Sequence, residues 1–176
     1  VMYLLELDPP TGELLEKTPL AVVQRPLSQD QTRQHLSCIP AISRGLAVCP
    51  TWNGLLVSVD LTTKTLRWVH SQFGVAEKAG MRSRRQSHIY ESEGFLTVPM
   101  IAGGRVFDLP RYSSMLQCID LETGGVHWQV DRRDAIYVAA LCGDLLLVVD
   151  RRGCRALHVG NGFGKLRSSL VLMRDL

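Results

Sequence analysis

Short runs of alternating apolar and polar residues follow one another along this chain, and residues typical of turns separate them. One pair of runs covers 45–50 and 55–59, with a Trp-Asn-Gly break at 52–54. A later pair covers 144–149 and 154–158, again with a glycine-containing break. Alternation with a period of two predicts β-strands, and tight breaks favour antiparallel neighbours. The pattern predicts an all-β protein built from small antiparallel meanders.

A motif of Asp, Thr and Trp recurs at the ends of these meanders, which is typical of a repeat protein. The stretch 118–128 reads CIDLETGGVHW, and 58–68 reads SVDLTTKTLRW with the same three residue types in the same places. The stretch 6–16 keeps Asp and Thr-Gly but ends on Glu16 in place of Trp. We predict a structural role for the motif residues Asp8, Thr11, Gly12, Asp60, Thr63, Trp68, Asp120, Thr123, Gly124 and Trp128.

Each residue of the motif suits a strand, a turn and a second strand. Asp at a strand end accepts hydrogen bonds from the backbone N–H groups of the following turn, and Thr does so more weakly. Gly12 and Gly124 allow a positive φ, so Lys64 at the same place predicts a different turn in its copy. Trp68 and Trp128 fall on the next strand, where a large aromatic ring covers the seam against a neighbouring sheet.

A weaker fourth copy occupies 158–168 and has Gly160 where the others have Asp. The Asp positions then lie 52, 60 and 40 residues apart, and the shortest spacing matches a four-stranded propeller blade. The longer spacings imply insertions in polar stretches. We predict a partial β-propeller of antiparallel four-stranded blades over 1–176: the end of one blade at 1–16, a loop at 17–37, a blade at 38–68, a loop at 73–94, and blades at 95–130 and 135–170.

Composition and charge narrow the functional classes. With 45% hydrophobic and 21% charged residues among 176, the chain is globular, and a net charge of +3 is too small for a dedicated nucleic-acid binder. No apolar run reaches the roughly 18 residues of a membrane span. The five cysteines form no CxxC pair, so we interpret them as small buried residues and leave one disulfide open. Because the chain begins without Met inside a strand-like run, we expect a piece of a longer protein.

The spacing small-x-Asp-x-x-Thr-Gly-x-x-x-Trp, as at Cys118 to Trp128, resembles the tryptophan-docking motif of the pyrroloquinoline-quinone (PQQ) type propeller repeat. That family includes quinoprotein alcohol dehydrogenases and outer-membrane assembly lipoproteins, and the run 95–166 most resembles large bacterial PQQ-like propellers. The resemblance implies seven or eight blades and an extracytoplasmic, often periplasmic, location. In the dehydrogenases it implies PQQ and calcium near the propeller axis, whereas Asp8, Asp60 and Asp120 match the docking motif.

Three other patterns are candidates for chemistry. The stretch 160–165 reads GNGFGK, but a phosphate-binding loop needs Ser or Thr after the Lys and Leu166 follows, so we interpret it as a blade turn. Histidines at 70, 88, 127 and 158 lack metal-ligand spacing, and we interpret them as surface or packing residues. Arginines at turns suggest an anion-binding surface, with ordinary solvated turns as the alternative. These arginines are Arg132, Arg133, Arg151, Arg152 and Arg155.

From these observations we expect a non-catalytic β-propeller scaffold or protein-interaction module without a cofactor. Its partners would be proteins, including the remaining blades of the same protein or another copy, and neither nucleic acid nor a membrane span is expected. The alternative is part of a PQQ-dependent quinoprotein dehydrogenase, with PQQ and calcium bound at a site completed by blades outside this chain.

Overall fold

The structure is a computed structural model and describes residues 1–22, 39–51, 54–72, 98–110, 113–151 and 153–168. These residues form antiparallel β-sheets, which confirms the predicted all-β fold class. The strands are β1 Met2–Leu7, β2 Leu14–Ala21, β3 Ala41–Ser43, β4 Leu46–Pro50, β5 Leu55–Asp60, β6 Thr65–Ser71, β7 Met100–Ala102, β8 Arg105–Asp108, β9 Met115–Asp120, β10 Val126–Asp131, β11 Ala135–Cys142, β12 Leu145–Asp150, β13 Gly153–His158 and β14 Gly164–Ser168.

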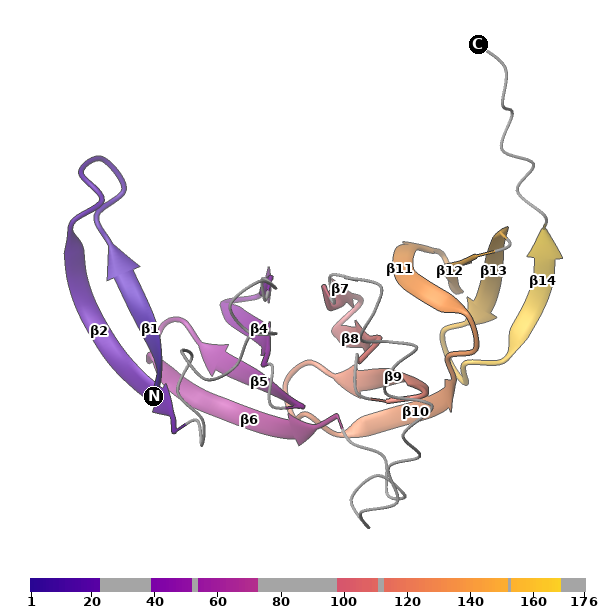
Figure 1. The fold of residues 1–176 in the computed structure, drawn as a ribbon, viewed down its shortest axis with the longest axis horizontal. Helices are drawn as coiled ribbons and strands as arrows, with labels where there is room; N and C mark the ends of the chain where they lie inside the picture. The colour runs from indigo at the N-terminus through magenta and orange to yellow at the C-terminus, as the bar shows by residue number, and fades with distance from the viewer. Residues whose placement is uncertain (23–38, 52–53, 73–97, 111–112, 152, 169–176) are drawn as a thin grey trace.

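The strands form one two-stranded hairpin and three four-stranded meanders. We call β1–β2 the hairpin, β3–β6 the first blade, β7–β10 the second blade and β11–β14 the third blade. The four units follow one another around an open arc, with β2, β6, β10 and β14 along its outer rim (Figure 1). Strand β7 lies on the inner side of the arc, beside β3 and β11. This is the arrangement of consecutive propeller blades.

The third strands of the first and second blades are buried on both faces, because each of these sheets lies between two neighbours. In β5 the consecutive residues Leu56, Val57, Ser58 and Val59 are all buried, and four consecutive residues of β9 are buried in the same way. In contrast, the outer strand β10 is exposed on one side, and its residues approximately alternate between exposed and more buried, as expected for a half-exposed strand.

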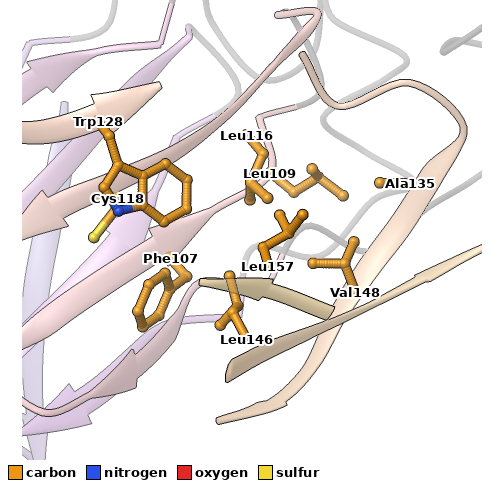
Figure 2. Packing of buried hydrophobic residues seen from close by; sticks show 9 residues of the cluster. All are labelled: Phe107, Leu109, Leu116, Cys118, Trp128, Ala135, Leu146, Val148 and Leu157. Atoms are coloured by element: carbon orange, nitrogen blue, oxygen red, sulfur yellow. The ribbon is translucent and has the colours of Figure 1, made fainter. Parts of the chain in front are cut away.

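Two apolar clusters fill the spaces between the blades. Leu46, Val48, Leu56 and Trp68 of the first blade pack against Val106, Ile119 and Leu121 of the second. The second and third blades share a larger cluster, in which the rings of Phe107 and Trp128 lie 6.2 Å apart at 43° (Figure 2). The other members of the larger cluster are Leu109, Leu116, Cys118, Ala135, Leu146, Val148 and Leu157. Burial of this apolar area is the main force holding neighbouring blades together.

The two ends of the strands form two different faces of the arc. The amide of Leu61 donates a hydrogen bond of 2.8 Å to the carbonyl of Gly45, so the β3–β4 and β5–β6 turns lie at the same end. The amide of Gln72 donates one of 2.8 Å to Gly54, at the opposite end. We call the end carrying the β5–β6, β9–β10 and β13–β14 turns the turn face, and the opposite end the loop face.

One predicted boundary is wrong. The first blade end was expected to stop at residue 16 with a loop over 17–37, but β2 continues to Ala21 and pairs with β1 along its whole length. The outer strand carries polar residues on both faces, such as Lys17, whose Nζ lies 4.1 Å from the ring centroid of Tyr3, so it shows no alternation. The rest of that loop, 23–37, and the predicted loop 73–94 lie outside the described residues.

Candidate functional site: the contacts between blades

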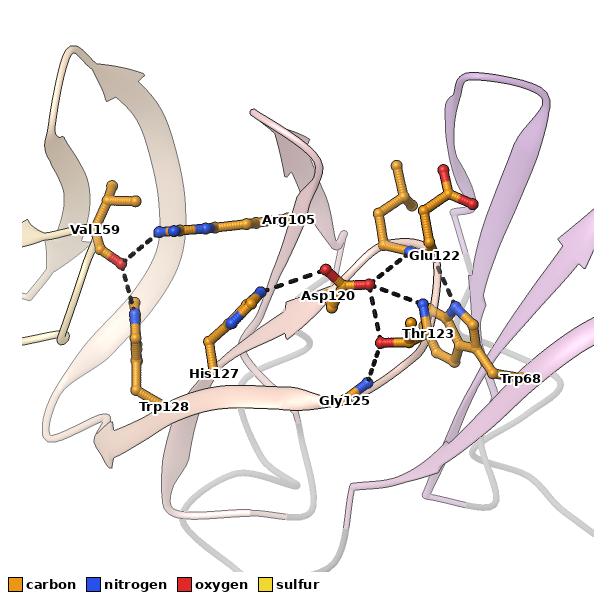
Figure 3. A network of polar contacts seen from close by, with 10 residues as sticks. Trp68, Arg105, Asp120, Glu122, Thr123, Gly125, His127, Trp128 and Val159 are labelled. Atoms are coloured by element: carbon orange, nitrogen blue, oxygen red, sulfur yellow. Dashed lines mark hydrogen bonds and ion pairs between the residues drawn. The ribbon is translucent and has the colours of Figure 1, made fainter.

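The carboxylate of Asp120 organises the β9–β10 turn on the turn face. Its Oδ1 accepts hydrogen bonds from the amides of Glu122 at 3.0 Å and Thr123 at 2.8 Å, and from the Thr123 hydroxyl at 2.9 Å (Figure 3). The Thr123 hydroxyl in turn accepts from the amide of Gly125 at 3.2 Å. Hydrogen bonds from Thr123 hold the pKa of Asp120 below its usual value. The carboxylate is thus used within its own turn.

The β5–β6 turn has the same design although Lys64 replaces glycine. The Asp60 carboxylate accepts from the amides of Thr62 at 2.8 Å and Thr63 at 2.9 Å, and these bonds lower its pKa. Lys64 adopts a φ of 57°, close to the 73° of Gly124. The prediction of a different turn at Lys64 is therefore wrong. The hydrogen bonds to Asp60 hold the turn in the left-handed conformation at Lys64, although this conformation is energetically unfavourable for a residue with a side chain.

The β1–β2 turn keeps the side-chain bonds in a looser form. Asp8 Oδ2 accepts from the Thr11 hydroxyl at 2.6 Å and from the Thr11 amide at 3.3 Å. Gly12 has a φ of 73°, and a Cβ added to it would meet nothing within 4 Å. This turn is open on the side that a Trp of the neighbouring blade covers in the β9–β10 and β13–β14 turns.

The fourth copy of the motif is shifted by two residues from the predicted frame. The amide of Gly162 donates to the carbonyl of His158, as Gly124 does to Asp120, so His158 and not Gly160 takes the Asp position. His158 Nδ1 accepts from the amide of Gly160 at 3.1 Å, as the Asp carboxylate does in the other copies. Residues 159–161 form a turn and β14 begins at Gly164, so the interpretation of GNGFGK as a blade turn is confirmed.

Trp68 and Trp128 each reach across to the turn of the next blade. Trp68 Nε1 donates 2.8 Å to the carbonyl of Leu121, and Trp128 Nε1 donates 2.6 Å to the carbonyl of Val159. Figure 3 shows both indoles directed at the neighbouring turn, with Arg105 Nη1 donating a second bond of 3.0 Å to Val159. Each indole therefore combines apolar burial with a satisfied N–H group.

The glycines of these turns are required by the indoles as well as by the backbone. A Cβ on Gly124 would lie 2.8 Å from Cδ2 and Cγ of Trp68. A Cβ on Gly162 would lie 2.8 Å from Cε3 of Trp128. Trp and Gly therefore act as a pair: the ring of one blade rests where the next blade has no side chain.

The junction between the hairpin and the first blade uses the same two positions with different residues. Glu16 stands at the Trp position of β2, and its carboxylate forms an ion pair with the ammonium of Lys64, which stands at the Gly position. Lys64 Nζ also lies 2.5 Å from Glu6 of β1. The bond to Lys64 lowers the pKa of Glu16, and the two glutamates raise the pKa of Lys64. In the aligned copies, Glu16 falls at the Trp position and Lys64 at the Gly position, and this coincidence could have predicted their pairing from the sequence.

A buried polar chain joins the blades on the loop face. Gln72 Nε2 donates 2.7 Å to Oδ2 of Asp108, and both side chains are buried. Arg132 Nη1 donates 2.8 Å to the carbonyl of Pro110, and its charge acts on the Asp108 carboxyl. Arg155 Nη2 donates 2.5 Å to the carbonyl of Arg132. Side chains from three blades thus meet in one polar network. The sequence did not predict this network, because its residues belong to no recognisable motif.

The arginines predicted as an anion-binding surface divide into three groups. Arg132 and Arg155 are buried and donate to backbone carbonyls, so they are not part of a surface. Arg133 and Arg151 are exposed, and aspartates at 131, 134 and 150 lie close enough to act on the charge of Arg155. Arg152 lies outside the described residues. Of the described arginines in this set, Arg133 and Arg151 are therefore the ones that lie on the surface.

Asp108 is the most perturbed acid of the described residues. It is fully buried, and desolvation raises its pKa to about 6, against the lowering effects of Gln72 and Arg132. Its Oδ1 is buried without a hydrogen-bond partner. Burial therefore moves the pKa of this carboxyl to about 6, in a place that also joins the first and second blades.

The cysteines and histidines have varied surroundings. Burial raises the pKa of Cys118 to about 11 and also raises that of Cys49, which disfavours the reactive thiolate. Cys142 is exposed, unlike the small buried residue we predicted, because it ends an inner strand. His70 bonds to Gln117 at 2.9 Å. Across the described ranges, no group of three His, Cys, Asp or Glu residues is placed to hold a metal, and no helix is long and apolar enough to cross a membrane.

No protein-family model and no curated protein matches the chain. Its structure is similar to the quinohemoprotein alcohol dehydrogenase ADHIIG from Pseudomonas putida HK5, at 14% identity and a TM-score of 0.60 over 93% of this chain and 31% of the enzyme. It is also similar to the computationally designed Ika4 protein, at 13% identity and a TM-score of 0.54 over 76% of this chain and 72% of Ika4.

BamB from Moraxella catarrhalis matches at 21% identity and a TM-score of 0.47 over 69% of this chain and 32% of BamB. The chain spans about a third of the length of BamB and of the dehydrogenase. Identities this low establish the fold and leave the activity to the site. The propeller fold that the resemblance implies is therefore confirmed: the described residues form consecutive four-stranded blades of a β-propeller.

Proposed function

We propose that the chain is a non-catalytic β-propeller scaffold whose β1 strand binds a β-sheet of another blade. The observation that carries the proposal is the apolar face of β1, where Tyr3, Leu5 and Leu7 are 42%, 52% and 51% exposed. Side chains two apart on a strand share one face, so the three lie on one side of β1, with the Lys17 ammonium over the Tyr3 ring. A surface of this kind is typical of a protein interface.

The complete blades indicate what covers this face. Leu7 precedes Asp8 as Val59 precedes Asp60 and Ile119 precedes Asp120, and both Val59 and Ile119 are 0% exposed. Ile119 is covered by the preceding blade, where it packs in the cluster with Trp68. The same surface on β1 therefore fits a preceding blade, supplied by the remaining blades of the same protein or by another copy.

Among the described strands, β1 pairs along one edge only, and its other edge adds hydrogen-bonding capacity to the apolar face. Strand β1 pairs with β2 on one side, whereas its counterparts β5 and β9 each pair on both sides. An unpaired edge next to an apolar face favours the addition of a further strand. Pro9 lacks the N–H that Leu61 and Leu121 donate to the first turn of their own blades, so the added strand would pair without that bond.

A scaffold role agrees with the way the chain uses its acidic residues. Asp60 and Asp120 direct their carboxylates into their own turns, and the described residues supply no acid cluster suited to calcium. These residues do not fit the calcium site of a PQQ dehydrogenase, so the dehydrogenase alternative requires ligands from outside the described part. We also propose an extracytoplasmic location, which the resemblance to PQQ-like propellers implies.

The test measures association of the 176-residue chain by sedimentation velocity across a range of concentrations. We expect concentration-dependent oligomers that disappear in the double variant Leu5→Lys, Leu7→Lys. Ile42→Lys is the control, because Ile42 is a 65% exposed apolar residue on an inner strand away from β1. Equal association of the double variant and the wild type would contradict the proposal, and a saturable absorbance change on adding PQQ with calcium would favour the dehydrogenase.

A further inference from the structure

The hairpin and the first blade meet through a pair of residues that replaces Trp and Gly. Counted from the Asp of each motif, Glu16, Trp68 and Trp128 occupy the same position on the outer strand. Trp68 lies against Gly124 of the next turn, and Glu16 pairs with Lys64, which stands where Gly124 stands. The two departures from the motif, Glu16 and Lys64, therefore belong to one contact.

Lys64 also resolves a conflict within the hairpin. Glu6 and Glu16 are direct cross-strand partners in the β1–β2 ladder, and like charges in that relation repel each other. The Lys64 ammonium contacts both carboxylates, one on each strand. Without Lys64, the hairpin would lose these two ion pairs with the next blade and keep an uncompensated pair of negative charges.

Neither of the two apolar clusters extends to this junction, although Val59, at the position of Ile119, is buried. None of the described side chains of the hairpin is buried, and none belongs to either apolar cluster. The side chains of Lys64, Glu6 and Glu16 are 31%, 48% and 50% exposed, so dissolved ions have access to the contact. Salt weakens exposed ion pairs within a Debye length, whereas it leaves the burial of Trp68 in place.

The two kinds of contact exclude each other. A Trp at position 16 would meet the Lys64 side chain where Trp68 meets the bare backbone of Gly124. A Glu at position 68 would face the carbonyl of Leu121, which can only accept a hydrogen bond. The residue pair thus determines which outer strand fits which turn.

We propose that Glu6, Glu16 and Lys64 form an ionic latch that seats the hairpin on the first blade and releases it at high salt, while the Trp–Gly junctions stay closed. This makes the first junction the place where the arc opens. An isolated two-stranded hairpin is marginally stable in water, so a released hairpin loses its own hydrogen-bond protection.

The test follows amide hydrogen exchange of β1 and β2 in the 176-residue chain at 0.05 M and 1 M NaCl. We expect exchange in the hairpin to rise about tenfold at high salt, and exchange in β9 to stay constant. Equal salt response of the hairpin and β9 would overturn the proposal.

Lys64→Gly gives the sharpest variant, because the two explanations of Lys64 predict opposite signs. If Lys64 were only a poor substitute for glycine, removing a side chain at a φ of 57° would protect the hairpin. The latch instead predicts faster exchange at low salt and loss of the salt response. Slower or unchanged exchange in Lys64→Gly would overturn the proposal.

A charge reversal and a matched control complete the design. The triple variant Glu6→Lys, Glu16→Lys, Lys64→Glu should restore the protection and the salt response of the wild type, since it inverts every charge of the latch. Arg67→Glu is the control, because Arg67 lies 3.9 Å from Glu122 across a junction that Trp68 also holds. We expect it to leave hairpin exchange unchanged. Failure of the triple variant to restore protection would show that charge is not what seats the hairpin.

Discussion

The junction between the first and second blades and the junction between the hairpin and the first blade use the same two backbone positions with opposite chemistry. At the former, Trp68 rests on Gly124 over an apolar cluster. At the latter, Glu16 binds Lys64 at the surface without such a cluster. An indole over an apolar cluster marks the first contact and an exposed ion pair the second, so one repeat frame holds junctions of different chemistry.

The comparison separates two reasons for glycine in the blade turns. Lys64 shows that a φ near 57° can be held by a residue with a side chain when Asp60 fixes the turn. Gly124 is different because a Cβ there would collide with the indole of Trp68. Glycine is therefore needed mainly where an indole docks, and the backbone conformation alone tolerates other residues at a cost.

The largest effect is expected from removing a docked indole. Trp128→Ala should destabilise the chain by about 3 to 5 kcal/mol, since it empties the seam between the second and third blades and leaves the Val159 carbonyl to Arg105. Urea denaturation followed by circular dichroism measures the loss. Trp128→Phe keeps most of the apolar area and should cost clearly less. A loss in Trp128→Ala well below 1 kcal/mol would contradict the assignment of Trp128 to the seam.

The next effect isolates the glycine beneath an indole. Gly124→Ala combines a left-handed backbone cost of about 1 to 2 kcal/mol with overpacking of about 1 to 3 kcal/mol against Trp68. Gly12→Ala is the matched control, because Gly12 has the same φ of 73° and open space around it. We expect the control to show the backbone cost alone in the same denaturation assay. Equal losses in the two variants would mean that the indole does not require the glycine.

The repeat made much of this arrangement predictable. Asp120, Thr123 and Trp128 recur with Asp60, Thr63 and Trp68 at one spacing, so a strand, a turn and a seam follow from sequence alone. The blade to which each Trp points did not follow, because the contact of Trp68 with Leu121 spans 53 residues. Pairing Glu16 with Lys64 required that same knowledge of neighbouring turns.

Other features could not be found by matching residue types. His158 accepts the turn hydrogen bond through Nδ1, as Asp does through its carboxylate in the other copies. The predicted alignment matched Gly160 to the Asp and was therefore shifted by two residues. Strand β2 reaches Ala21 because an outer strand can be polar on both faces and still pair fully with β1. Gln72 and Asp108 form a buried hydrogen bond, and neither residue belongs to a recognisable sequence motif. Each of these depends on which chain segments become neighbours in space.

The buried hydrogen bond between Gln72 and Asp108 joins the first and second blades on the loop face. Because burial raises the pKa of Asp108 from 3.8 to about 6, the folded chain holds this proton over a range in which the unfolded chain has released it. Stability should therefore fall as pH rises from about 4 through 6, by roughly 2 to 3 kcal/mol from this group. Denaturation of wild type and Asp108→Asn at pH 4.5 to 7.5 checks this. Identical pH profiles would contradict it.

The smallest effect is expected at Asp120, and its pH dependence has the opposite sign. Hydrogen bonds from Thr123 lower its pKa below 3.8, so the folded chain favours the carboxylate, and this stabilisation is present above about pH 4 and lost as pH falls through the folded pKa. Asp120→Asn should cost about 1 kcal/mol at pH 7, because the side chain is partly exposed and an amide oxygen still accepts a bond.

The difference between Asp120→Asn and wild type should shrink below pH 4, where the wild-type carboxylate is also neutralised. The same substitution at Asp8 is the comparison, since its turn lies beyond the weakly seated end of the arc and carries no docked indole. If the turn matters mainly as the seat of Trp68, Asp120→Asn will cost more than Asp8→Asn, because a distorted turn also misplaces the Leu121 carbonyl. Equal costs would indicate that each carboxylate stabilises its own turn and contributes nothing to the junction.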